Sequence, residues 1–215
     1  MKRIRWKVAQ FFERLWWLSY LKKKNKSEYL SWKKNYWLEF LNNFPFKFNT
    51  NQIILDVGCG PAGTFILSNF VSAKSWTAID PLVLIYKELE IFNKEDYPKV
   101  DFINSNFEEF KADKKFDVVF CINALNHFIN IDKNLQKLNS LLNNEATIIL
   151  STDTHNYKFL KWILYSLPLD ILHPHQYTDK EYEQMFTKAN FQVEKKILIK
   201  KEFIFSYHAY LLKRC

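Results

Sequence analysis

All three glycines of this 215-residue chain, Gly58, Gly60 and Gly63, lie within one six-residue window. A chain of this length and average composition would contain roughly 15 glycines. The window follows a short apolar run, residues 53–57, which is typical of a strand buried on both faces of a parallel sheet. Because glycine permits a tight turn and a close approach of the backbone to a ligand, this pattern predicts a strand–turn–helix unit.

Apolar runs and helical periodicity alternate after this turn. The expected strands cover residues 53–57, 75–79, 100–103, 116–121 and 146–150, and the expected helices cover roughly 62–71, 82–93 and 131–142. Thr178 and Glu181 then form a capping box for a helix that ends near Asn190. Two last strands, 192–199 and 203–212, predict a C-terminal antiparallel hairpin. This order predicts an α/β fold with a doubly wound, seven-stranded sheet.

The formal charge of +8 belongs to the N-terminal segment alone. Residues 1–26 contain nine basic residues and one acid, Glu13, so the remainder of the chain is neutral. Residues 2–21 have the pattern of an amphipathic helix, and a second helix over 28–43 would begin at Ser27 as its N-cap. We therefore expect an N-terminal helical extension, 1–46, and an α/β domain, 47–215, with a cap segment at 151–178.

Composition excludes several classes of protein. Hydrophobic residues make up 48% and charged residues 25% of the chain, which excludes a disordered chain. Cys59, Cys121 and Cys215 lie far apart without metal-ligand spacing, so we expect no disulfide framework and a reducing, cytoplasmic setting. Glu13 and Arg14 interrupt the apolar N-terminus, so we expect neither a secretory signal nor a membrane-spanning helix.

The glycine loop predicts a nucleotide-like cofactor. Gly58-x-Gly60-x-x-Gly63 follows a strand and opens a helix, and Asp80 at the end of the next strand can accept hydrogen bonds from a ribose. Both NAD(P) and S-adenosylmethionine use such a loop. Asp56 can pair with the cationic amino group that only the second cofactor has. Too little chain follows for a separate dehydrogenase domain, so the pattern favours S-adenosylmethionine.

With these motifs, residues 50–212 resemble the class I S-adenosylmethionine-dependent methyltransferases, especially the small-molecule type labelled type 11. The resemblance is carried by IILDVGCGPAG at 53–63, AID at 78–80, SNFEEF at 105–110, FDVVFCINALNHF at 116–128 and HPHQYT at 173–178. It implies a Rossmann-like sheet, S-adenosylmethionine as cofactor and an enzyme that transfers methyl groups.

The resemblance also implies the residues that bind the cofactor. They are Asp56, Gly58 and Gly60 at its methionine end, Asp80 at the ribose, Asn106 and Phe107 at the adenine, and Asn123 beside the methionine and the methyl group. Two positions depart from the usual family pattern. Asn106 replaces an aspartate, and Asn126-His127 replaces a Glu-His pair.

Methyl transfer from a sulfonium requires mainly proximity and orientation, and a base only when the acceptor carries a proton. The candidate bases are His127, His155, His173 and His175, since imidazole titrates near neutral pH, and we favour His127, His173 and His175 among them. The alternative for each is that it orders the cap through hydrogen bonds. A metal at His173 and His175 lacks a third ligand, so we expect none.

The cap suggests a small, apolar or lipid-like acceptor, with O-methylation slightly preferred. The Pro-Pro-Tyr motif of DNA amino-methyltransferases is absent after residue 123, so we expect no DNA substrate. Three roles are open for the N-terminal helix. It covers the cleft as a lid, it contacts the inner face of the membrane peripherally through residues 1–26, or it contacts RNA. The alternatives for the whole chain are an RNA methyltransferase and a catalytically inactive cofactor-binding module.

Overall fold

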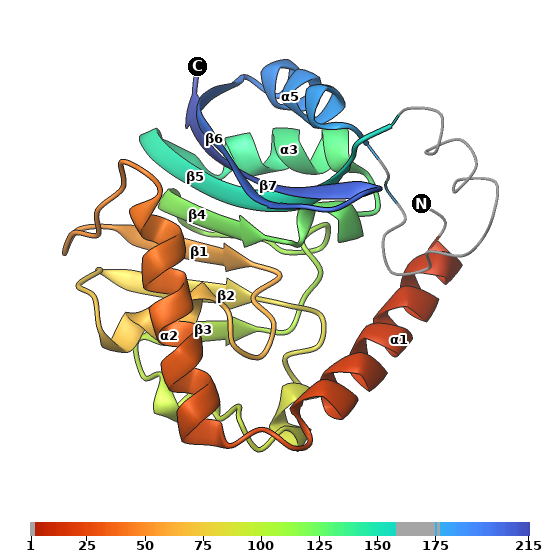
Figure 1. The fold of residues 1–215 in the computed structure, drawn as a ribbon. Helices are drawn as coiled ribbons and strands as arrows, with labels where there is room; N and C mark the ends of the chain where they lie inside the picture. Colours follow the sequence, from red (N-terminus) through yellow and green to blue (C-terminus); the bar gives the residue numbers. More distant parts are fainter. Residues whose placement is uncertain (1–2, 158–174, 176) are drawn as a thin grey trace.

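The structure, a computed structural model, describes residues 3–157, 175 and 177–215, with the backbone alone for residues 3–7 (Figure 1). Seven strands of the described chain form one sheet in the order β3-β2-β1-β4-β5-β7-β6, in which β7 is antiparallel to both neighbours. The strands are β1 (Ile53–Val57), β2 (Ser75–Ile79), β3 (Val100–Ile103), β4 (Phe116–Ile122), β5 (Leu142–His155), β6 (Phe191–Lys201) and β7 (Phe205–Arg214). The predicted α/β class and the C-terminal hairpin are confirmed.

Helices cover both faces of this sheet (Figure 1). The α-helices are α1 (Arg3–Leu21), α2 (Lys26–Asn42), α3 (Ile131–Ser140) and α5 (Asp179–Lys188), and the 3-10 helices are η1 (Thr64–Asn69), η2 (Tyr86–Glu88), η3 (Lys94–Asp96) and η4 (Leu125–His127). Helix α2 lies on one face, and α3 and α5 lie on the other. Helix α1 instead stands at the carboxyl ends of the parallel strands.

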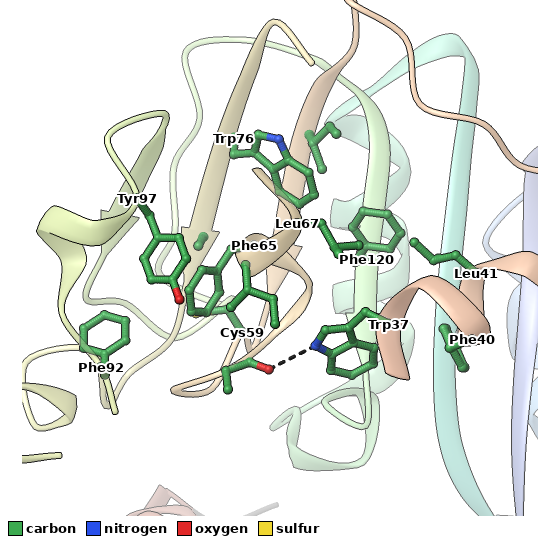
Figure 2. Close-up of a cluster of buried hydrophobic side chains, with 14 of the residues drawn as sticks. Trp37, Phe40, Leu41, Cys59, Phe65, Leu67, Trp76, Phe92, Tyr97 and Phe120 are labelled. Carbon is green, nitrogen blue, oxygen red and sulfur yellow. Dashed lines mark hydrogen bonds between the residues drawn. The ribbon is translucent and has the colours of Figure 1, made fainter. Parts of the chain in front are cut away.

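Successive strand residues point to opposite faces and so build two apolar cores. Ile54 packs in the core beneath α2, whereas Leu55 packs in the core beneath α3 and α5. Figure 2 shows the first core, in which Nε1 of Trp37 donates to the carbonyl oxygen of Ala62 at 3.1 Å. This bond joins α2 to the glycine loop, so the helix that covers the sheet also holds the loop in place.

The expected α-helices over 62–71 and 82–93 are wrong. The first is the 3-10 helix η1, and the second is a series of turns that contains η2. The backbone there closes i→i+3 hydrogen bonds, from Ile66 to Gly63, from Ile85 to Leu82 and from Leu89 to Tyr86. Asp56 and Asp80 hold the starts of the two segments by accepting the N–H groups of Phe65 and Leu82.

Two smaller expectations are also corrected. Helix α2 begins after Asn25, not Ser27, because the Asn25 side chain accepts the backbone N–H of Glu28 at 3.1 Å. Strand β5 continues to His155 and pairs there with β7, so the first five residues of the expected cap segment belong to the sheet. Residues 158–174 and 176 of that segment lie outside the described residues.

The capping box of α5 is confirmed and makes a testable contribution to stability. Thr178 Oγ1 accepts the N–H of Glu181, and Glu181 Oε2 accepts the N–H of Thr178 at 2.8 Å. We expect Thr178→Ala to lower the free energy of unfolding by about 1 kcal/mol, measured by urea denaturation. Thr187→Ala, at an exposed hydroxyl in the same helix, is the control and should change it by less than about 0.5 kcal/mol. Equal losses in the two variants would contradict the capping role.

Candidate functional site

The glycine loop turns sharply over the end of β2. Gly58 and Gly60 have φ angles of 64° and 59°, a region that residues with a side chain rarely occupy. The N–H of Gly58 donates to the carbonyl oxygen of Ile79 at 2.8 Å. The N–H of Gly60 donates to Asp80 Oδ2 at 3.0 Å. The loop is therefore anchored to the neighbouring strand, as a preformed binding loop requires.

Asp80 is a buried carboxylate at the centre of these contacts. Besides Gly60, it accepts the N–H of Leu82 at 2.8 Å and the hydroxyl of Tyr86 at 3.0 Å, both through Oδ1. Burial raises its pKa above the usual value, while the three hydrogen bonds oppose that shift. The carboxylate also lines a cavity, so one group both fixes the loop and faces a ligand.

Asp56 lies beneath the loop. Its Oδ2 accepts the Thr64 hydroxyl at 2.7 Å and the N–H of Phe65 at 2.9 Å. Burial raises its pKa to about 7. The linings of the two cavities described below do not include it. The structure thus assigns Asp56 a role in holding the loop, and its contact with an amino group stays a prediction.

Cavity A opens at the carboxyl ends of β1 and β2 and contains about 510 Å³ of empty space. That space includes open solvent at the mouth, so cavity A is a partly open cleft. Its walls are residues 57–58, 79–81, 105–108, 123–124 and 127–128, with Gln10 and Glu13 of α1. Asp80, Asn106 and Phe107 therefore face one common space, as the sequence predicts.

Cavity B lies on the other side of the loop and contains about 1210 Å³ of empty space. Its walls are residues 58–60, 62–63, 122–123, His127 and Tyr207, with Glu13, Trp16 and Trp17 of α1 and Lys33, Tyr36 and Trp37 of α2. Glu13, Gly58, Asn123 and His127 line both cavities. Two ligands, or two parts of one ligand, would therefore meet at this shared wall.

The shared wall is held by hydrogen bonds from β5. Asn123 has a φ of 53°, and its N–H donates to the carbonyl oxygen of Ser151 at 3.0 Å and to Ser151 Oγ at 3.1 Å. Ser151 Oγ lies 2.6 Å from the hydroxyl of Tyr207. His127 follows on η4 and turns toward both cavities. Strand β7 therefore contributes to the site through Tyr207, which the sequence analysis did not identify.

Asn106 and Phe107 form the far wall of cavity A. The Asn106 Oδ1 accepts the N–H of Glu109 at 2.7 Å, which fixes the amide. The Phe107 ring stacks on Phe128, with centroids 5.2 Å apart and planes 12° from parallel. The Lys137 ammonium lies 5.2 Å from the Phe107 centroid, on the ring face. Both predicted side chains are thus held rigidly at the cavity.

His175 is not brought into either cavity. His175 Nε2 donates to the carbonyl oxygen of Phe128 at 2.6 Å, and its ring stacks on Tyr177. It contacts the back of the cavity A wall and lines neither cavity. His173 lies outside the described residues. Among the described histidines, cysteines and carboxylates, no group of three is placed to hold a metal ion.

Helix α1 borders both cavities. Gln10 and Glu13 line cavity A, Glu13, Trp16 and Trp17 line cavity B, and Arg14 forms an ion pair with Glu88 at 2.9 Å. Several large apolar side chains of the helix are exposed: Val8, Phe11, Phe12, Leu15, Trp16 and Tyr20. Glu13 is the one acid of the basic segment, and that isolated charge could have indicated in the sequence which face of α1 lines the cavities.

The cavity walls fit S-adenosylmethionine, the cofactor that the sequence predicts. Asp80 offers a carboxylate to a ribose in cavity A, and Gly60 exposes backbone in cavity B without a side chain to obstruct a ligand. Two buried polar atoms in these walls lack a partner among the described residues, the acceptor Oε1 of Gln10 and the donor Nε1 of Trp17. Buried polar atoms are normally hydrogen-bonded, so a polar ligand would satisfy them.

Comparisons with known proteins identify the family of the chain. A family model described as a methyltransferase domain matches residues 29–196. The chain is 32% identical over 99 residues to a ubiquinone biosynthesis O-methyltransferase of Rickettsia akari, which covers 46% of this chain and 39% of the relative. It is 29% identical over 166 residues to methyltransferase 235L of invertebrate iridescent virus 6, which covers 68% of this chain and 61% of the relative. The chain thus spans two to three fifths of the length of these relatives.

The fold is similar to that of an S-adenosylmethionine-dependent methyltransferase from Clostridium acetobutylicum. The TM-score is 0.63, and the match covers 96% of this chain and 99% of the other. The two sequences are 14% identical, so this likeness concerns the fold.

The geometry of the loop predicts how much stability is lost when Gly58 or Gly60 is replaced by alanine. A Cβ at Gly58 would lie 2.5 Å from the Cβ of Ala124, whereas a Cβ at Gly60 would meet only Trp17 at 3.5 Å. We expect Gly60→Ala to cost about 1–2 kcal/mol through its positive φ. Gly58→Ala should cost about 1–3 kcal/mol more, because overpacking adds to the strain. Denaturant unfolding measures both losses.

A double variant separates the two causes. Ala124→Gly removes the Cβ that Gly58→Ala would strike, so the pair should recover most of the additional loss. Additive losses in this double-mutant cycle would contradict the steric explanation.

Proposed function

The chain belongs to the methyltransferase-domain family, and from that premise we propose that it transfers a methyl group from S-adenosylmethionine to an oxygen atom of a small, apolar or lipid-like acceptor. One observation carries the proposal. Cavities A and B meet at a wall formed by Glu13, Gly58, Asn123 and His127, so a cofactor and an acceptor can be held against each other there.

Each half of the cofactor has a matching surface. Asp80 would accept the ribose hydroxyls in cavity A, with Asn106 and Phe107 beside the adenine. The methionine end would pass Gly58 and Gly60 into cavity B. When bound, S-adenosylmethionine supplies a methyl group on a sulfonium, which needs no further activation.

The role of the protein is then to position the acceptor and to accept the proton that its hydroxyl loses. The shared wall holds the acceptor oxygen in line with the methyl group, which is the arrangement that lowers the barrier most. An imidazole nitrogen of His127 would accept the proton of the attacking hydroxyl. His175, bonded to the backbone of Phe128, would order the wall, and His173 is retained as a second candidate base.

An apolar acceptor fits the composition of cavity B. Its walls away from the glycine loop are mostly aromatic and come from three elements of the fold: Trp16 and Trp17, Tyr36 and Trp37, and Tyr207. Such walls bind planar or apolar molecules through dispersion and burial of apolar surface. The name of the Rickettsia akari relative, an O-methyltransferase of ubiquinone biosynthesis, supports oxygen as the methylated atom.

Calorimetric titration with S-adenosylmethionine tests the proposal. The wild-type protein should bind it, and Asp80→Asn should weaken binding by about tenfold or more, because hydrogen bonds to a charged acceptor are lost. Asp101→Asn makes the same chemical change at an exposed residue of β3 and should leave the affinity unchanged.

Turnover is tested with labelled cofactor and 2-naphthol as the acceptor. Transfer of the methyl group to the naphthol oxygen is expected. Absence of cofactor binding would overturn the proposal. Binding without transfer to naphthol or to other hydroxyl, amine and carbon acceptors would instead support a catalytically inactive module.

We further propose that α1 contacts the surface of an anionic membrane on the cytoplasmic side. Six large apolar side chains of the helix are exposed, among them Phe11 at 56% and Trp16 at 49% of their surface. The exposed lysines Lys22, Lys23 and Lys24 follow at the end of the helix. A surface with both aromatic and basic side chains favours the headgroup region of anionic lipid. An RNA-binding surface would need the basic residues but not so much exposed apolar surface.

Nothing in the described helices has the length and apolarity to cross a bilayer. The proposed contact is therefore a helix lying on the membrane surface, which would place the mouth of cavity B beside a reservoir of lipid-soluble acceptors.

Vesicle flotation tests this contact on the full chain. We expect binding to phosphatidylserine-containing vesicles, and a loss of about tenfold or more when Phe11→Ser and Phe12→Ser are combined, because two apolar rings are no longer buried. Phe203→Ser is the matched control, since this ring is exposed on the turn between β6 and β7. Equal flotation of the double variant and the wild type would rule out α1 as the contact.

A further inference from the structure

Lys33 of α2 is the one lysine or arginine that lines cavity B in the described chain. Its ammonium is surrounded by aromatic faces. Nζ lies 5.4 Å from the centroid of Trp32, 5.3 Å from that of Tyr36 and 4.8 Å from that of Trp37. Contacts of this kind attract a cation and hold it in a defined place.

Lys33 is not paired with an acid in the described part of the chain, although Glu13 lines the same cavity. Among the described residues, none of the carboxylates forms an ion pair with its ammonium. Burial lowers its pKa to about 8. An ammonium that is partly removed from water without a counter-charge is costly, and an anion in the cavity would relieve that cost.

The position of Lys33 separates it from the glycine loop. An added Cβ at Gly60 meets Trp17, and no atom of Lys33 lies within 4 Å of a Cβ added at Gly58 or Gly60. Two of the rings around its ammonium, Tyr36 and Trp37, belong to the aromatic wall of cavity B. Cavity B also has more than twice the empty volume of cavity A, which leaves room for an acceptor beside the methionine end of a cofactor.

We propose that Lys33 binds a carboxylate of the methyl acceptor, so that the enzyme prefers aromatic or apolar acids to neutral molecules of the same shape. The inference rests on the proposed function and specifies its substrate class. The aromatic wall would bury the body of the acceptor, and the ammonium would select its charged end and so set the orientation in which a hydroxyl reaches His127.

The test compares two probes of nearly the same shape, of which only the first is charged, 2-naphthoate and 2-naphthamide. Each is titrated into the full chain saturated with S-adenosylhomocysteine, the product form of the cofactor. We expect the carboxylate to bind about tenfold or more tightly than the amide, because a charge-assisted bond to Lys33 is added. Equal binding of the two probes by the wild-type protein would overturn the proposal without any substitution.

Variants then assign the preference to this side chain. Lys33→Met and Lys33→Gln should both remove the preference for naphthoate while binding of naphthamide changes by less than about threefold. Lys33→Arg should retain it. Lys34→Met is the matched control, because Lys34 is the next residue of α2, lies 4.9 Å from the Phe70 ring centroid and does not line cavity B.

The cofactor has a carboxylate of its own, so its affinity is measured in the same variants. Unchanged binding of S-adenosylhomocysteine by Lys33→Met is expected. A loss of that affinity with the naphthoate preference intact would assign Lys33 to the cofactor and overturn the proposal. Failure of the wild-type protein to bind S-adenosylhomocysteine would overturn the proposed function itself, whereas bound cofactor without a charge preference would overturn only the Lys33 site.

Discussion

The hydrogen bond from the Gly60 N–H to the Asp80 carboxylate is the contact on which the site depends. It joins the loop after β1 to the end of β2 and places a buried negative charge where a ligand arrives. The same carboxylate accepts the N–H of Leu82 and the hydroxyl of Tyr86, so it also shapes the chain that follows. Burial makes that charge costly, and the hydrogen bonds that offset the cost also make the loop rigid.

Helix α1 adds a second constraint, since Gln10 and Glu13 face the cavities while six of its large apolar side chains are exposed. Ordinary surface helices bury their apolar side against the core. Here Glu13 lies in the wall shared by both cavities, whereas Phe11, Phe12 and Leu15 are exposed. The arrangement is explained if an apolar surface outside the chain covers these rings, and the membrane contact proposed above supplies one.

The parts of the fold that follow local pattern could be predicted from the sequence. The run 53–57 is recognisable because a strand buried on both faces is continuously apolar, and the glycines mark the turn after it. The α-helices expected over 62–71 and 82–93 are wrong because apolar periodicity does not distinguish an α-helix from the 3-10 helices and turns that form there. Periodicity likewise identifies the two sides of α1 without telling which side faces inward, and Lys33 and Tyr207 reach the site only through tertiary packing.

The shared wall has an energetic consequence for the two ligands. Glu13 lines both cavities, so α1 borders a cofactor that extends from cavity A into cavity B as well as an acceptor beside it in cavity B. Any ordering of α1 on binding would be borne by the first ligand, and the second would find the helix already ordered. The two affinities would then rise together by the same factor, whichever ligand binds first.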